Sequence, residues 1–123
     1  MGNKNKAKGT AFETLIVNYL KENNFPNARR TALAGENDSG DIHGVAQAFE
    51  VSPKEVAIQC KNQKSFKLSE WLNATVEQAT KLRNGVPLLV VKRPGKGEKA
   101  LGESYAVMRL EDMLKLLRDA HFS

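Results

Sequence analysis

The chain has 123 residues, of which 41% are hydrophobic and 27% charged, and its formal net charge at pH 7 is +5. This length predicts one domain that buries a core unaided, and the single cysteine excludes an intrachain disulfide and a cysteine-based zinc site. No apolar run approaches the ~18 residues of a membrane span, and the basic start lacks a signal-peptide stretch, so we expect a cytoplasmic protein without membrane contact.

The first half of the chain predicts one helix and three strands. Apolar residues recur at helical spacing after the basic start, and two later segments alternate as strands do. In chain order we expect a flexible basic start, an amphipathic helix, a short strand, a turn-rich loop and the two arms of a hairpin, at residues 1–7, 6–24, 28–33, 34–40, 41–50 and 55–62.

The second half predicts two further strands between two helices. Ser69 is the expected N-cap of a helix that runs to about Arg83 and is closed by Asn84 and Gly85. A buried strand, a loop, an outer strand and a closing helix follow, at residues 86–91, 94–102, 104–109 and 110–120. The apolar residues of the closing helix are expected to point inward: Met113, Leu114, Leu116 and Leu117. The order αβββαββα predicts a single α/β domain, residues 1–123, with a mixed β-sheet flanked by helices.

Two features carry candidate chemistry. Asp41 stands between a glycine-containing loop and an apolar strand, and Gln59 and Lys61 lie two apart at the end of the next strand. The two-residue period of a strand puts Gln59 and Lys61 on one face, with Cys60 directed into the core. If the two arms pair as a hairpin, Asp41 lies beside the end of the second arm. The three polar side chains then converge at one end of the sheet.

This group of side chains is the one that phosphodiester hydrolysis requires. A carboxylate binds a divalent metal, a second oxygen ligand fixes the metal's geometry, and a nearby cation orients the attacking water. The ordinary interpretations remain open: Asp41 as a loop cap, Lys61 as a solvated strand end, and Gln59 as a glutamine on an edge strand.

The pattern resembles the PD-(D/E)XK nuclease superfamily, and Gln59-Cys60-Lys61 is similar to the glutamine-x-lysine strand end of Mrr-type restriction endonucleases. Lys8-Gly9 followed by Phe12-Glu13, and then Arg29-Arg30, resembles the opening of archaeal and phage Holliday-junction resolvases. The resemblance covers about residues 8–93. It implies a restriction-endonuclease-like fold, and it makes Glu13 a further metal ligand and catalytic residue beside Asp41, Gln59 and Lys61.

Two positions depart from the family pattern. Gly40 replaces the proline that precedes the first aspartate, and Gln59 replaces the second acidic residue. An amide offers a carbonyl oxygen to a metal but contributes no charge, so Glu13 becomes more necessary as a second carboxylate.

Two interpretations of the basic residues stay open: a surface that binds nucleic acid, and an ordinary solvated face. Charge alone does not decide between these interpretations. The candidate DNA contacts are Lys8, Arg29, Arg30, Lys64, Lys92 and Arg93. Strand alternation directs only one of the two neighbouring arginines toward the site. His43 shares a strand face with Asp41 but is expected to be structural, and Trp71 is expected in the core although it could stack on a base.

The resemblance implies a DNA endonuclease that uses Mg²⁺ or Mn²⁺ and resolves Holliday junctions. Such enzymes are homodimers because two symmetric cuts need two sites, and they act in the cytoplasm, that of the host for a phage protein. The alternatives are a restriction- or repair-type nuclease on linear DNA, and a DNA-binding protein of the same fold with a decayed site. A basic protein-interaction module is a third class, and it would show no salt-sensitive DNA binding.

Overall fold

The computed structural model describes residues 2–31 and 40–123, with side chains from residue 6 onward. Its elements in chain order are α1 (Gly2–Glu22), β1 (Arg29–Arg30), β2 (Ile42–His43), β3 (Glu55–Lys61), α2 (Leu68–Ala79), β4 (Gly85–Val91), η2 (Glu98–Glu103), β5 (Tyr105–Val107) and α3 (Leu110–Asp119). The order αβββαββα is therefore confirmed, and the 3-10 helix η2 occupies part of the segment predicted as a loop over 94–102. The predicted loop at residues 34–39 lies outside the described residues.

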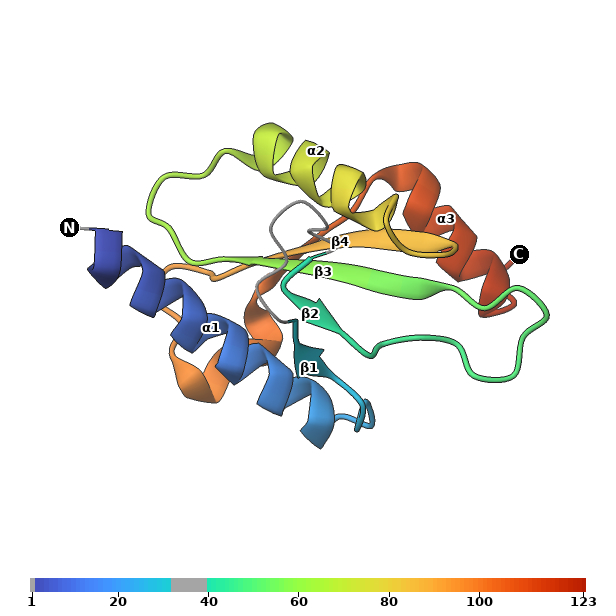
Figure 1. Ribbon diagram of the computed structural model, residues 1–123, viewed down its shortest axis with the longest axis horizontal. Coiled ribbons are helices and arrows are strands. Elements are labelled where there is room, and N and C mark those ends of the chain that lie inside the picture. The colour runs from blue at the N-terminus through green and yellow to red at the C-terminus, as the bar shows by residue number, and fades with distance from the viewer. Residues whose placement is uncertain (1, 32–39) are drawn as a thin grey trace.

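The five strands form one mixed sheet in the order β1-β2-β3-β4-β5. The β3–β4 pair is parallel and the other three pairs are antiparallel. Helix α1 lies on one side of this sheet and helix α2 on the other (Figure 1). Strand β3 is consequently the central strand, covered on both faces, and the prediction of an α/β protein with a mixed sheet flanked by helices is confirmed.

Strand alternation gives the sheet two separate apolar layers. On the α1 side, Phe12 and Ile16 pack with Ile42, Ile58 and Cys60. On the α2 side the core is formed by Trp71, Leu89 and Val91. Each of these buried apolar side chains contributes about 1.5–3 kcal/mol relative to exposure, so the two layers hold the helices against the sheet. The predictions that Cys60 and Trp71 are core residues are confirmed.

Several element boundaries differ from the predicted ones. Helix α1 begins at Gly2 instead of near Lys6, and β2 is two residues long, followed only by an isolated bridge between Ala46 and Glu55. Ser69 is not the N-cap of α2: the helix begins at Leu68 with Lys67 in the N-cap position, so Ser69 lies inside the first turn. None of the described helices is long and apolar enough to cross a lipid bilayer.

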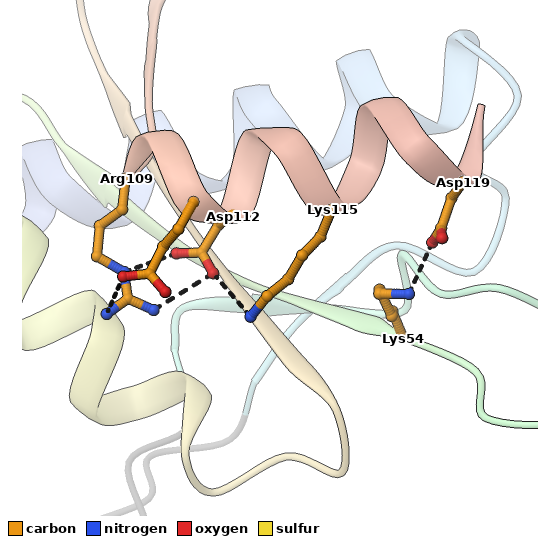
Figure 2. A network of polar contacts seen from close by, with 6 residues as sticks. Lys54, Arg109, Asp112, Lys115 and Asp119 are labelled. Carbon is orange, nitrogen blue, oxygen red and sulfur yellow. Dashed lines mark hydrogen bonds and ion pairs between the residues drawn. The ribbon is translucent and has the colours of Figure 1, made fainter. Parts of the chain in front are cut away.

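Helix α3 presents a different face to the sheet from the one predicted. Asp112 is 1% exposed, whereas Met113 and Leu114, predicted to point inward, are 39% and 42% exposed. The Asp112 carboxylate accepts hydrogen bonds from Arg109 Nε at 2.7 Å and from Lys115 Nζ at 3.5 Å (Figure 2). Leu116 and Leu117 are half-buried, so the predicted inward face is wrong for Met113 and Leu114, and the ion-paired Asp112 is buried in their place.

The far end of α3 is held by a second carboxylate. Asp119 Oδ2 accepts a hydrogen bond from Lys54 Nζ at 2.8 Å (Figure 2). It also accepts a hydrogen bond from Gln47 Nε2 at 2.9 Å. The hydrogen bond from Lys54 is the main cause that lowers the pKa of Asp119. These contacts tie the segment between β2 and β3 to the C-terminal helix.

We expect Asp112→Ala to lower the free energy of unfolding by about 1.5–3 kcal/mol, the usual size for a hydrogen bond to a charged group. Chemical denaturation followed by circular dichroism measures this change. The matched control is Glu111→Ala, because Glu111 is exposed and 3.7 Å from the same Arg109; it should change stability by less than about 0.5 kcal/mol. Equal effects of the two substitutions would contradict an anchoring role for Asp112.

Candidate active site

Asp41 binds the central strand through both its backbone and its side chain. Its backbone N–H donates to Ile58 O at 2.7 Å, and its Oδ2 accepts the backbone N–H of Cys60 at 2.8 Å. In regular strand pairing, a backbone carbonyl of the neighbouring strand would accept the Cys60 N–H. Here the Asp41 carboxylate accepts it instead. The carboxylate is thereby fixed beside residues 59–61, so the structure brings Asp41 to the end of β3 as the hairpin geometry predicted.

Gly40 makes this approach possible. Its φ is +113°, and a Cβ at this position would lie 3.1 Å from Ile58 O. L-residues with side chains rarely adopt this region, and proline, whose φ is fixed at about −65°, is excluded from it. The backbone therefore excludes proline at residue 40, and it turns sharply to deliver Asp41 against β3.

Gln59 is buried in the central strand, with 8% of its surface exposed. The interpretation of Gln59 as an ordinary glutamine on an edge strand is therefore wrong. Thr75 Oγ1, on α2, donates to Gln59 Oε1 at 2.6 Å and lies 2.8 Å from Trp71 O. The 2.6 Å separation fits an O–H···O bond and is short for N–H···O, so the oxygen of the amide faces Thr75. A carbonyl oxygen has two lone pairs, so the bond from Thr75 does not use the full accepting capacity of Gln59 Oε1.

Lys61 shares the strand face of Gln59, as predicted from the two-residue period. Its Nζ lies 5.8 Å from the centroid of the Trp71 ring, a cation–π contact that holds the ammonium group on the α2 side of the sheet. Thr75 was not predicted as the partner of Gln59. The sequence feature that could have indicated it is a hydroxyl residue on the apolar, sheet-facing side of the helix that follows Gln59 and Lys61.

Glu13 lies on α1, the helix that covers the opposite face of the sheet. Its Oε1 accepts a hydrogen bond from Arg30 Nε at 3.1 Å. Its charge and that of Asp41 both act on the buried thiol of Cys60, so the two carboxylates lie near the same part of β3. Glu13 therefore lies near Asp41 but projects from α1, not from the strand face that carries Gln59 and Lys61.

The strand register separates the two adjacent arginines. Arg30 pairs with Ile42, whose side chain faces α1, and Arg29 pairs with His43. Arg29 and His43 therefore share the opposite face, the one that carries Gln59 and Lys61 on β3. Alternation thus directs the two arginines to opposite faces, as predicted. Arg30 is the one that contacts a candidate site residue, Glu13, whereas Arg29 Nη1 donates to Asn27 O at 3.4 Å.

The remaining candidate DNA contacts lie on three segments. Lys8 on α1 and Lys64 after β3 are exposed, and Lys92 follows β4 and is partly buried. Arg93 is already engaged, since its Nη1 lies 3.6 Å from Glu103 Oε1 and its guanidinium carbon lies 5.7 Å from the Tyr105 ring centroid. Lys64, Lys92 and Arg93 are near the end of the sheet that carries Lys61.

The side chains that offer oxygen or nitrogen ligands decide whether a divalent cation fits at this end of β3. Within the described residues, no three side chains of His, Cys, Asp or Glu come together as a metal cluster. Mg²⁺ is commonly bound through one or two carboxylates, with waters and substrate phosphates completing its shell, and therefore does not need such a cluster. The Asp41 carboxylate is one such ligand, and Glu13, whose charge also acts on the Cys60 thiol, is the nearby candidate for a second carboxylate. The Gln59 oxygen is held on the α2 face by Thr75.

No family model, curated protein or solved structure matches this chain. The functional assignment therefore depends on the site residues and their geometry.

Burial, followed by the charges of Asp41 and Glu13, raises the pKa of the Cys60 thiol well above its ordinary value. As the pH rises above about 8.5, the thiol of the unfolded chain loses its proton before the thiol of the folded chain does. The contribution of Cys60 to the free energy of unfolding is therefore fully present below that pH, and it is lost as the pH approaches the pKa of the folded state. We expect unfolding free energies measured between pH 8 and 10 to fall faster for the wild type than for Cys60→Ala. The difference in slope is at most about 1.4 kcal/mol per pH unit, and parallel slopes would contradict it.

Proposed function

We propose that this chain is a metal-dependent DNA endonuclease that hydrolyses phosphodiester bonds in branched DNA, with a four-way junction as its main substrate. The observation that carries the proposal is the common position of Asp41, Gln59 and Lys61 at one end of the central strand. The Asp41 carboxylate accepts the Cys60 N–H of this strand, and the strand itself carries the buried Gln59 amide and the Lys61 ammonium group two residues apart.

Each residue has a role in this proposal. Asp41 and the Gln59 oxygen hold Mg²⁺ or Mn²⁺, and Thr75 positions that oxygen through its hydroxyl. The cation supplies charge stabilisation at the phosphate oxygens. Lys61 orients the attacking water. Glu13 adds a second carboxylate: its exposed ion pair with Arg30 is worth only about 0.2–1 kcal/mol, so a cation or a phosphate group readily replaces one partner.

The charge distribution supports DNA as the substrate. The net charge of +5 attracts a polyanion, and Lys8, Arg29 and Lys64 are exposed for phosphate contacts. The sequence contains no recognisable base-reading motif, which favours recognition of DNA shape and backbone over base sequence. The proposal includes a homodimer, because paired cuts in a symmetric junction need two sites, and a location in the cytoplasm.

Gln59 also supports a second candidate, a DNA-binding protein with the nuclease fold and a decayed site. An uncharged amide weakens cation binding compared with the glutamate or aspartate of the family pattern. This candidate predicts salt-sensitive DNA binding without hydrolysis, whereas the first predicts both.

Cleavage of a labelled four-way junction, beside a linear duplex of the same sequence, tests the proposal. We expect paired symmetric nicks in the junction with Mg²⁺ or Mn²⁺ and none with chelator. Asp41→Asn is the sharpest variant, because the amide oxygen still accepts the Cys60 N–H while the charge is removed. We expect Asp41→Asn and Lys61→Ala to lower the rate at least about 100-fold, since charge stabilisation is worth several kcal/mol.

The control variant is Lys21→Ala, which removes an exposed charge from the last turn of α1 and should leave the rate within about two-fold of the wild type. Cutting of both substrates would retain the site and make the protein a general or restriction-type nuclease. Salt-sensitive binding without any metal-dependent cutting would refute the nuclease proposal and leave the decayed-site candidate.

A further inference from the structure

A group of three aromatic rings lies on the α2 face of the sheet. The Phe66 ring is tilted against Trp71 and meets the Tyr105 ring edge-on, with centroid separations of 6.0 Å in both pairs. Trp71 is buried, but Phe66 and Tyr105 remain 38% and 41% exposed. Two large rings in mutual contact therefore keep much of their surface open to solvent.

The strand register places these rings beside the candidate active site. Lys61 on β3 pairs with Val91 on β4, and Val91 pairs with Tyr105 on β5. Paired residues project from the same face of a sheet, so Tyr105 lies in the same row as Lys61, two strands away. Two strand spacings amount to about 10 Å, roughly three steps of a nucleic-acid strand. Phe66 stands on the segment that leads from Lys61 to α2.

Basic groups surround the open rings. Lys61 lies over Trp71, Arg93 lies over Tyr105 at 5.7 Å, and Lys64 and Lys67 are exposed on either side of Phe66. Acidic groups near the rings include Glu70, in the first turn of α2, and Glu103, which is paired with Arg93 and Lys96 at 3.6 and 3.2 Å. Cations therefore exceed carboxylates around the rings, and the combination of aromatic faces with positive charge is complementary to a nucleic-acid strand.

We propose that Phe66 and Tyr105 form a stacking surface for an unpaired base of the DNA strand. Its placement next to the cut phosphate depends on the function proposed above, whereas the stacking itself does not. In a duplex each base face is covered by its neighbours, so only a base freed at a branch point, flap or gap has a face to offer. The rings therefore select DNA in which pairing is interrupted near the site.

Binding of 2-aminopurine-labelled DNA to the full chain, with chelator present to prevent cutting, tests this inference. One DNA carries the probe in an unpaired three-nucleotide gap, and the other carries it within a continuous duplex. For the wild type we expect tighter binding of the gapped DNA and quenching of its probe. Phe66→Leu and Tyr105→Leu keep an apolar side chain but remove a ring, and each should weaken gapped binding about ten-fold while duplex binding changes little.

Two controls separate stacking from folding and from general affinity. Tyr105→Phe keeps the ring and should bind like the wild type, and so should Phe49→Ala, which removes a fully exposed ring from the segment between β2 and β3. Leucine variants that bind both DNAs like the wild type, or that lose both equally, would overturn the stacking surface. Ring-dependent binding in a protein that cuts no DNA would support the stacking surface and refute the nuclease proposal.

Discussion

The hydrogen bond from the Cys60 N–H to the Asp41 carboxylate is the contact on which the candidate site depends. It replaces a backbone bond of the sheet, so the aspartate is fixed by the same ladder that builds the central strand. Gly40 allows the sharp turn that this contact needs, and the buried Ile42–Ile58 pair sets the register from which the turn begins. The site is thus a local departure from regular strand pairing, within a sheet that is otherwise held by apolar packing.

Much of the fold follows from sequence periodicity, because both faces of the sheet are buried. A one-residue slip of β3 would exchange Ile58 and Cys60 with Gln59 and Lys61, which makes the register unambiguous. The helix ends were less predictable: α2 begins at Leu68, before the expected capping residue Ser69. The inward face of α3 was mispredicted for Met113 and Leu114 because an apolar stripe normally faces the core, whereas here the ion-paired Asp112 is buried.

The grouping of Asp41, Gln59 and Lys61 was predictable from strand period and hairpin pairing, both of which act within about twenty residues. Thr75 was not, since its contact with Gln59 requires knowing how α2 crosses the sheet. The rings of Phe66 and Tyr105 are 39 residues apart in the sequence, by their numbers, and meet only because β4 aligns β3 with β5. When two residues are brought together by a third strand, no pattern in the sequence near either residue predicts their contact.

Mn²⁺ binding, followed by the electron paramagnetic resonance signal of the free ion, tests the central claim most directly. We expect the wild type to bind Mn²⁺ with an affinity that falls at least about ten-fold in Asp41→Asn and rises in Gln59→Glu, which restores a charged ligand. Glu111→Gln, an exposed carboxylate on α3, should leave the affinity unchanged. Failure of the wild type to bind Mn²⁺, or equal binding by Asp41→Asn, would contradict a metal site at the end of the central strand.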